Sequence, residues 1–229
     1  MEASAQAREL LAVLAAEAGA EALSWLRRGL PQPGASFARG LFFGFYAGAG
    51  RRFRQPDLAP NAELRARLAA AGVLRAEVWT LSDLARAALL LSAATVVPEP
   101  DQIEIATEAF RKGDSAERIA LLRSLPLLPA GERLVPLAVE ACRTHVLDVF
   151  AAMACENPYP ARHFPELNFN QLVIKTLFCE LALDRVIGWR DRQNSELVRM
   201  AGDYEAERRA AGRSVPADIA LIKAAKEVP

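Results

Sequence analysis

Residues 5–30 read AQARELLAVLAAEAGAEALSWLRRGL, and this stretch indicates the fold class. Its apolar residues recur at spacings of one to four, as on a helix with one buried face, and charged residues fall mostly off this stripe. The stripe consists of Leu10, Leu11, Leu14, Ala18, Ala22 and Trp25. A glycine at 29 and prolines at 31 and 33 follow it, and both residue types end helices. One amphipathic helix is therefore predicted from about Ala5 to Leu30.

The rest of the chain repeats this pattern in shorter pieces, separated by glycines and prolines. No run alternates with the period of a strand, and no Asn-Gly or Asp-Gly hairpin turn occurs. The sequence predicts an all-α protein with one domain over residues 1–229. Its helical hairpins are expected to stack antiparallel in an irregular, α-solenoid-like (HEAT/armadillo-like) arrangement. Polar residues ahead of apolar runs predict N-terminal caps at Asn61, Thr80, Asp114, Asn168 and Asn194.

Residues 36–54 are rich in phenylalanine and glycine. Gly40, Gly44 and Gly48 are four residues apart, so on a helix they would lie on one side and let another backbone approach. Because glycine weakens a helix by up to about 1 kcal/mol per residue, an irregular or broken helix is the alternative. A basic cluster of Arg51, Arg52 and Arg54 lies next to these phenylalanines. It is a candidate contact for lipid headgroups or a phosphorylated intermediate, and the alternative is a solvated basic helix end.

Charge and composition exclude several classes of protein. Of the 229 residues, 28 are Lys or Arg and 28 are Asp or Glu, which argues against a nucleic-acid-binding protein and against a clamp on anionic membranes. Cys142, Cys155 and Cys179 are odd in number and lack C-x-x-C spacing, so buried thiols in a reducing compartment are expected. No signal peptide is expected, and no apolar run reaches about 18 residues, the length of a membrane span. A cytoplasmic protein is expected, with peripheral contact to the inner membrane as the alternative.

The common sequence motifs of catalysis and cofactor binding are mostly missing. The chain contains no G-x-S-x-G, H-E-x-x-H or G-x-G-x-x-G pattern. Cys142 and His145 lie three residues apart, and Cys155 and His163 complete a set of four potential metal ligands. This spacing is too loose to indicate a metal site, so buried cysteines and a hydrogen-bonded histidine are expected instead. Neither a metal nor a cofactor is predicted.

Residues 143–175 combine polar side chains with loops on a helical scaffold, where ligand sites tend to lie. In a binding site, Arg143 and Lys175 would hold an anionic group. His163 would transfer protons, and Asn170 would orient a hydroxyl or carbonyl group. The candidate ligand-binding residues are Arg143, Asn157, Tyr159, His163, Asn170 and Lys175.

Structural anchoring is the competing interpretation of these residues. Asn157 would anchor the proline-rich turn, which comprises residues 156–165. Lys175 would extend to water from the wetter face of its helix. Asn170 falls on the apolar face of the same helix, so it is predicted to be buried. Its amide is expected to bond backbone groups within residues 156–166, which the prolines leave unpaired.

Several ordered blocks of the sequence resemble the EboA domain family. The blocks are NPYP at 157–160, HFPE at 163–166, NQLVIK at 170–175, NSELVRM at 194–200 and AGR at 211–213. The resemblance covers most of the chain from about Trp79, is densest over residues 142–213 and is less diagnostic over residues 1–75. Residues 183–192 depart from the family's pattern.

The resemblance implies a role in moving a secondary-metabolite precursor towards the periplasm, within a bacterial and algal gene cluster. The implied partners are other pathway proteins, among them a prenyltransferase-like membrane protein, and a small polar or phosphorylated intermediate. No reaction is implied for the family member itself, so we predict a non-catalytic helical scaffold, adaptor or intermediate-binding protein. The alternative is an enzyme or small-ligand binder for a cyclitol-like or sugar-phosphate-like intermediate, acting through Arg143, His163, Asn170 and Lys175.

Overall fold

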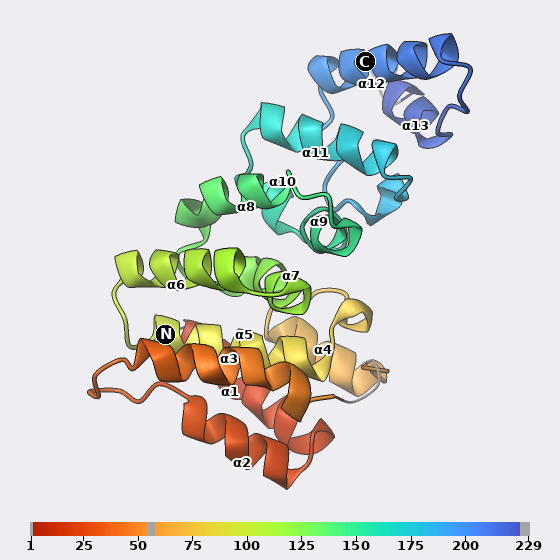
Figure 1. The fold of residues 1–229 in the computed structure, drawn as a ribbon. Helices are drawn as coiled ribbons and strands as arrows, with labels where there is room; N and C mark the ends of the chain where they lie inside the picture. Colours follow the sequence, from red (N-terminus) through yellow and green to blue (C-terminus); the bar gives the residue numbers. More distant parts are fainter. Residues whose placement is uncertain (1, 55–57, 225–229) are drawn as a thin grey trace. The chain divides into compact units, whose positions relative to one another are not determined.

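The computed structural model describes residues 2–54 and 58–224 (Figure 1). These residues form thirteen α-helices and four short 3-10 helices, and none of them lies in a strand, so the all-α prediction is confirmed. The chain divides into two compact units, Met1–Ala138 and Val139–Pro229. The single domain and the solenoid-like stacking of hairpins stay predictions.

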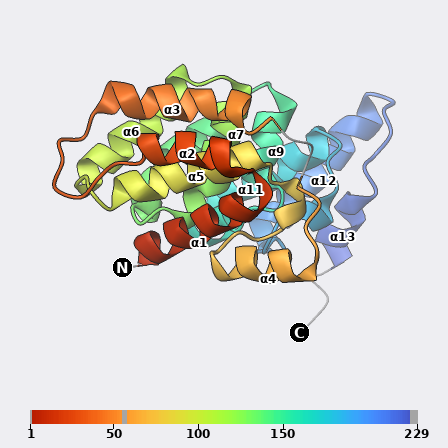
Figure 2. The same ribbon diagram turned by 90° about the horizontal axis from the view of Figure 1, so that it is seen from below.

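The first unit is built around α5 (Leu81–Ala94), which contacts α1, α3, α6 and α7 (Figure 2). Eleven of the fourteen α5 residues are buried, because the helix is apolar on nearly all sides. The other elements are α1 (Glu2–Glu17), α2 (Ala20–Gly29), α3 (Arg39–Arg52), α4 (Ala62–Ala70), η1 (Ala76–Val78), α6 (Glu99–Lys112), α7 (Ser115–Ser124), η2 (Leu125–Leu127) and η3 (Gly131–Leu134). Along the chain, α8 (Val135–Ala141) runs across the boundary between the two units.

The single helix predicted from Ala5 to Leu30 is wrong, because the structure breaks it into α1 and α2 at Gly19. Gly19 has a φ of 78°, in the left-handed region that glycine enters without the steric cost of a Cβ atom. The break lets α2 turn back and pack against α1. Leu10 and Ala22, from the two halves of the apolar stripe, are both buried as a result.

The helix α3 is continuous, so the broken helix considered for residues 36–54 does not form. A Cβ atom added at Gly40 or Gly44 would meet no described atom within 4 Å, so neither glycine admits a neighbouring backbone. At Gly48 the close neighbour is a side chain, because a Cβ there would lie 2.8 Å from Cζ2 of Trp25. The expected close approach of a second backbone along this glycine row is therefore wrong.

Four of the five predicted caps are confirmed, because each side chain accepts a hydrogen bond from the backbone N–H three residues further on. These caps are Asn61, Thr80, Asp114 and Asn194. The cap predicted at Asn168 is wrong, since α11 (Glu166–Phe178) already begins at Glu166. Pro165 precedes that helix with a φ of −54°, which suits the entry to a helix, and Asn168 lies inside the first turn.

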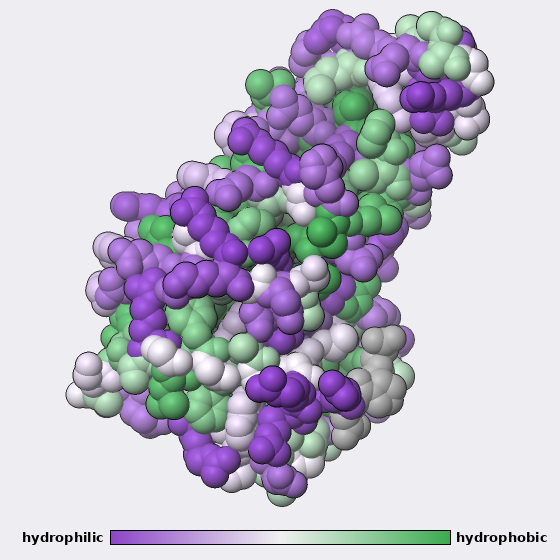
Figure 3. Space-filling model, in the orientation of Figure 1, coloured by the Kyte–Doolittle hydropathy of each residue, from purple (hydrophilic) through white to green (hydrophobic). Residues whose placement is uncertain are grey.

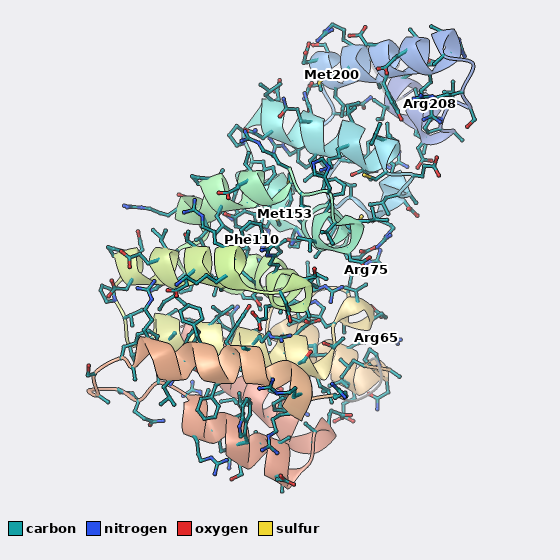
Figure 4. The ribbon with its side chains drawn as sticks, viewed as in Figure 1. Arg65, Arg75, Phe110, Met153, Met200 and Arg208 are labelled. Atoms are coloured by element: carbon teal, nitrogen blue, oxygen red, sulfur yellow. The ribbon has the colours of Figure 1, made fainter. Side chains whose placement is uncertain are left out.

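The second unit is centred on α11, which contacts α9, η4 and α12. Its core includes Met153 on α9, labelled in Figure 4, together with Phe150 and Phe169, and all three are buried. The remaining elements of this unit are α9 (Leu147–Ala154), α10 (Tyr159–His163), η4 (Leu183–Arg185), α12 (Ser195–Ala210) and α13 (Asp218–Ala224).

Candidate functional site

Asn157 holds the start of the proline-rich turn, where the chain passes from α9 to α10. Its Nδ2 donates to the Ala152 carbonyl at 2.9 Å, and its Oδ1 accepts from the Tyr159 N–H at 3.0 Å. A buried asparagine that bonds the backbone on both sides of a turn replaces hydrogen bonds that proline cannot make. The structure therefore places Asn157 in the anchoring position.

Tyr159 and His163 lie together on α10. The Tyr159 ring is fully buried, with its centroid 4.7 Å from that of His163 and 6.2 Å from that of Phe164. Burial raises the pKa of the Tyr159 hydroxyl well above its ordinary value of 10.0. Tyr159 is therefore a neutral hydroxyl near pH 7, packed against a half-buried imidazole.

An ion pair fastens the proline-rich turn to the segment that departs from the family pattern. Arg185 donates from Nε and Nη2 to the two carboxylate oxygens of Glu156, at 2.7 and 3.0 Å. The Glu156 N–H donates to the Arg185 carbonyl at 2.8 Å. Glu156 has a left-handed φ of 52°, and these bonds hold it there. The hydrogen bonds to Glu156 raise the pKa of Arg185.

Arg192 makes a second attachment between the same segments. Its Nη1 donates to the Pro160 carbonyl at 3.0 Å and to the Ala161 carbonyl at 3.2 Å. The guanidinium lies 4.4 Å from the centroid of the Phe169 ring. Two guanidinium groups thus bind the proline-rich turn, and neither Arg185 nor Arg192 was among the predicted site residues.

Asn170 is fully buried, as predicted, but its predicted hydrogen-bond partner is wrong. Its Nδ2 donates to Oδ1 of Asn194 at 3.0 Å, and Nδ2 of Asn194 donates to Oδ1 of Asn170 at 3.1 Å. Asn194 also caps α12 through the Leu197 N–H. The buried amide thus joins α11 to the start of α12 instead of bonding residues 156–166.

Lys175 does not extend to water, so the prediction of a wetter, uncommitted lysine is wrong. Its Nζ donates to the carbonyls of Cys142 and Thr144, at 2.6 and 2.7 Å. The same Nζ lies 4.6 Å from the centroid of the Phe150 ring. A cation that binds the free carbonyls after a helix satisfies acceptors that the helix leaves unpaired. Lys175 is therefore held by the backbone that follows α8.

The six predicted ligand residues divide into separate groups. Asn157, Tyr159 and His163 lie together at the proline-rich turn. Asn170 and Lys175 contact other partners, and Arg143 is exposed. The four potential metal ligands considered above do not gather into a metal-binding group among the described residues.

The first unit contains a buried charged centre that sequence reasoning missed. Asp83 is 3% exposed, and its Oδ2 accepts from Nη1 of Arg123 at 2.7 Å and from the Thr80 N–H at 3.0 Å. Arg86, one turn further along α5, is 2% exposed and is among the largest fully buried side chains. The signal in the sequence is a single arginine within an apolar run, because such a position on a central helix becomes buried.

Among the described residues, Arg86 has a hydrogen-bond partner on one edge only. Its Nε donates to the Tyr46 carbonyl at 3.1 Å, and its guanidinium lies 5.7 Å from the centroid of the Tyr46 ring. The Tyr46 hydroxyl donates to the Glu117 carbonyl at 2.8 Å, and burial raises the pKa of Tyr46. Nη1 of Arg86 is buried and has no hydrogen-bond partner among the described residues.

The described residues of the first unit line several hollows. A groove of about 600 Å³ lies between the start of α1, the end of α5 and residues 126–129. A smaller hollow of about 180 Å³ lies between the α2–α3 connection, Leu41 and Val96. The larger volume is in the range of small-molecule sites. The basic cluster of residues 51, 52 and 54 is exposed, and in Figure 3 strongly hydrophilic residues gather where α3 ends.

None of the helices in residues 2–54 and 58–224 is both long and apolar enough to span a bilayer. The chain matches no curated protein and no solved structure. A family model described as metabolite traffic protein EboA matches residues 7–223 of the 229-residue chain. The match includes the blocks around the proline-rich turn, Asn170 and Asn194 from which the resemblance was drawn. The chain therefore belongs to the EboA family.

Proposed function

We propose that this chain is a non-catalytic helical binding protein of a metabolite-traffic pathway. It holds other pathway proteins or a pathway intermediate, within secondary-metabolite biosynthesis or precursor export of the EboA type. The family description gives the broad role in metabolite traffic, and the arrangement of the side chains supports the non-catalytic part.

One observation carries this proposal: the polar residues of the family blocks bind their own backbone and each other. Asn157 and Lys175 bind main-chain groups, and Asn170 binds the cap of α12. Groups engaged in this way build a rigid helical body, and a reaction centre needs polar groups that converge on a substrate. The groove of about 600 Å³ supports the intermediate-binding form of the proposal.

The enzyme alternative draws on the same residues and receives less support. Its proton-transfer residue, His163, packs on Tyr159, while its proposed anion holder Lys175 binds two carbonyls. Catalysis through these groups would require Lys175 to leave both carbonyls.

The test uses the purified full-length chain as bait for the proteins encoded in the same gene cluster, each expressed separately. Retention of a pathway protein or of a co-purifying small molecule, identified by mass spectrometry, is expected. The outcome against the proposal is a chain that retains neither and is inert towards anionic liposomes. Turnover of a cyclitol or sugar phosphate, abolished in His163→Ala, would establish the enzyme alternative instead.

A further inference from the structure

The free edge of Arg86 is a feature of the first unit that packing leaves unexplained. The Nε edge is used by the Tyr46 carbonyl, but Nη1 is buried without a partner among the described residues. An arginine side chain carries five N–H donors and stays charged at any physiological pH. Arg86 as a residue is 2% exposed and its guanidinium makes one hydrogen bond to the described residues, so Nη1 is an unsatisfied donor of a buried cation.

The carboxylate one turn away, Asp83, makes no hydrogen bond to this guanidinium among the described residues. Asp83 is committed to Arg123 and to the Thr80 N–H. The Tyr46 ring offers its π face and the Tyr46 carbonyl offers one acceptor, and neither carries a negative charge. Burying a charge without a hydrogen-bonded counter-charge is costly, so this edge favours an anion from outside the chain.

Gly50 lies directly beside this edge. It is half-buried on α3, and a Cβ atom there would lie 3.0 Å from Nη2 of Arg86 and 3.9 Å from its guanidinium carbon. The next residue, Arg51, is exposed, as is Arg54 after the end of α3. An anion that comes near this end of α3 thus meets surface cations first, and Gly50 is the position without a side chain to cover Nη2.

We propose that the Nη1–Nη2 edge of Arg86 is an anion-binding site, reached past Gly50, for a phosphate or carboxylate group of a small molecule. This edge presents two parallel N–H donors at the spacing of two oxygens in either group. The proposal rests on the proposed function in one respect, that the small molecule is the intermediate which the chain holds.

The experiment titrates the full-length chain with inorganic phosphate and, separately, with acetate, against sodium chloride at equal ionic strength. Isothermal titration calorimetry and thermal unfolding are the readouts. The decisive pair of variants is Gly50→Ala and Gly44→Ala, because both replace a glycine of α3 and only the first adds an atom beside Arg86. Arg86→Met removes the charge itself.

We expect phosphate, acetate or both to bind and to raise the unfolding temperature of the wild type and of Gly44→Ala. In Gly50→Ala the affinity should fall about tenfold or more, the usual loss when one charged hydrogen bond of a pair is blocked. The relative affinities of phosphate and acetate identify the group. If Arg86→Met does not fold, the two alanine variants alone decide the question.

Three results would overturn the site: no response of the wild type to either anion, equal affinity in both alanine variants, or retained binding in a folded Arg86→Met. Each can occur while the chain still captures a pathway protein, which would leave the proposed function standing. Conversely, anion binding that depends on Gly50, in a chain that retains no partner and no intermediate, would support the site and reject the proposed function.

Discussion

Asn170 and Asn194 exchange two side-chain hydrogen bonds, of 3.0 and 3.1 Å, across 24 positions of the sequence. Asn194 also accepts from the Leu197 N–H and donates to the Arg192 carbonyl. The buried amide of α11 therefore orients the residue that caps α12. It also stabilises the loop in which Arg192 reaches the proline-rich turn.

Replacing Asn170 by Leu should destabilise the fold by about 1–3 kcal/mol, the cost of leaving a buried polar partner unpaired. Urea-induced unfolding followed by circular dichroism measures the change. The matched control is Asn168→Ala on the same helix, where a half-buried side chain that caps nothing should cost about 0.5 kcal/mol or less. Equal stabilities of Asn170→Leu and the wild type would show that the amide pair is unimportant for folding.

Replacing Lys175 by Met should also destabilise the fold by about 1–3 kcal/mol, because two carbonyls lose their donor. The contact of the ammonium group with the Phe150 ring is lost as well. The comparison is Lys112→Met. The Lys112 side chain is 77% exposed, and its ion pair with Glu108 contributes little to stability at the surface. Thermal unfolding of both variants gives the answer, and similar unfolding temperatures would speak against an anchored Lys175.

Alanine substitutions along α3 should change stability in opposite directions. Gly44→Ala should stabilise the protein by up to about 1 kcal/mol, because alanine favours the helix and its methyl group meets open space. Gly48→Ala should destabilise it by about 1–3 kcal/mol, because the new methyl group would lie 2.8 Å from the Trp25 ring. Chemical denaturation of the two variants separates these effects, and stabilisation by both would disprove the contact with Trp25.

Two thiols should resist alkylation in the folded chain. Burial raises the pKa of Cys142 to about 12 and that of Cys155 to about 11, from an ordinary value of 9.0. At about pH 8 the thiolate fraction is therefore small, and iodoacetamide should label both residues far more slowly than in the urea-unfolded chain. Mass spectrometry after digestion measures this, and equal rates in the two states would contradict it.

The same pKa shifts fix the sign of a pH effect on stability. The folded state holds the proton of each thiol more tightly than the unfolded state does. The stability that this burial contributes is thus fully present below about pH 9. It is lost as the pH rises through the raised values near 11 and 12.

Local patterns in the sequence predicted the parts of the structure that depend on neighbours three or four residues apart. The capping boxes at Thr80 and Asp114 are of this kind, and both formed as expected. The break at Gly19 was missed because a single glycine inside an apolar stripe leaves the helical period intact.

The candidate site could be predicted only as a set of residues. Sequence reasoning placed Asn170 on a buried face, but its partner Asn194 lies 24 residues away and no local pattern names it. Lys175 and its carbonyl acceptors are more than 30 residues apart in sequence. For Arg86, burial results from the packing of other helices around α5, which the sequence of that helix alone does not fix.

Because α5 is buried on nearly all sides, the N-terminal helices of the first unit cannot be removed as an independent appendage. Removing α1 and α2 would expose leucine and alanine side chains of α5 to water along the side that α1 covers. A chain truncated in this way would self-associate through the exposed apolar surface of α5, so we expect it to aggregate on expression. The first thirty residues, which belong to the less diagnostic part of the sequence, thus shield the most apolar helix of the unit from water.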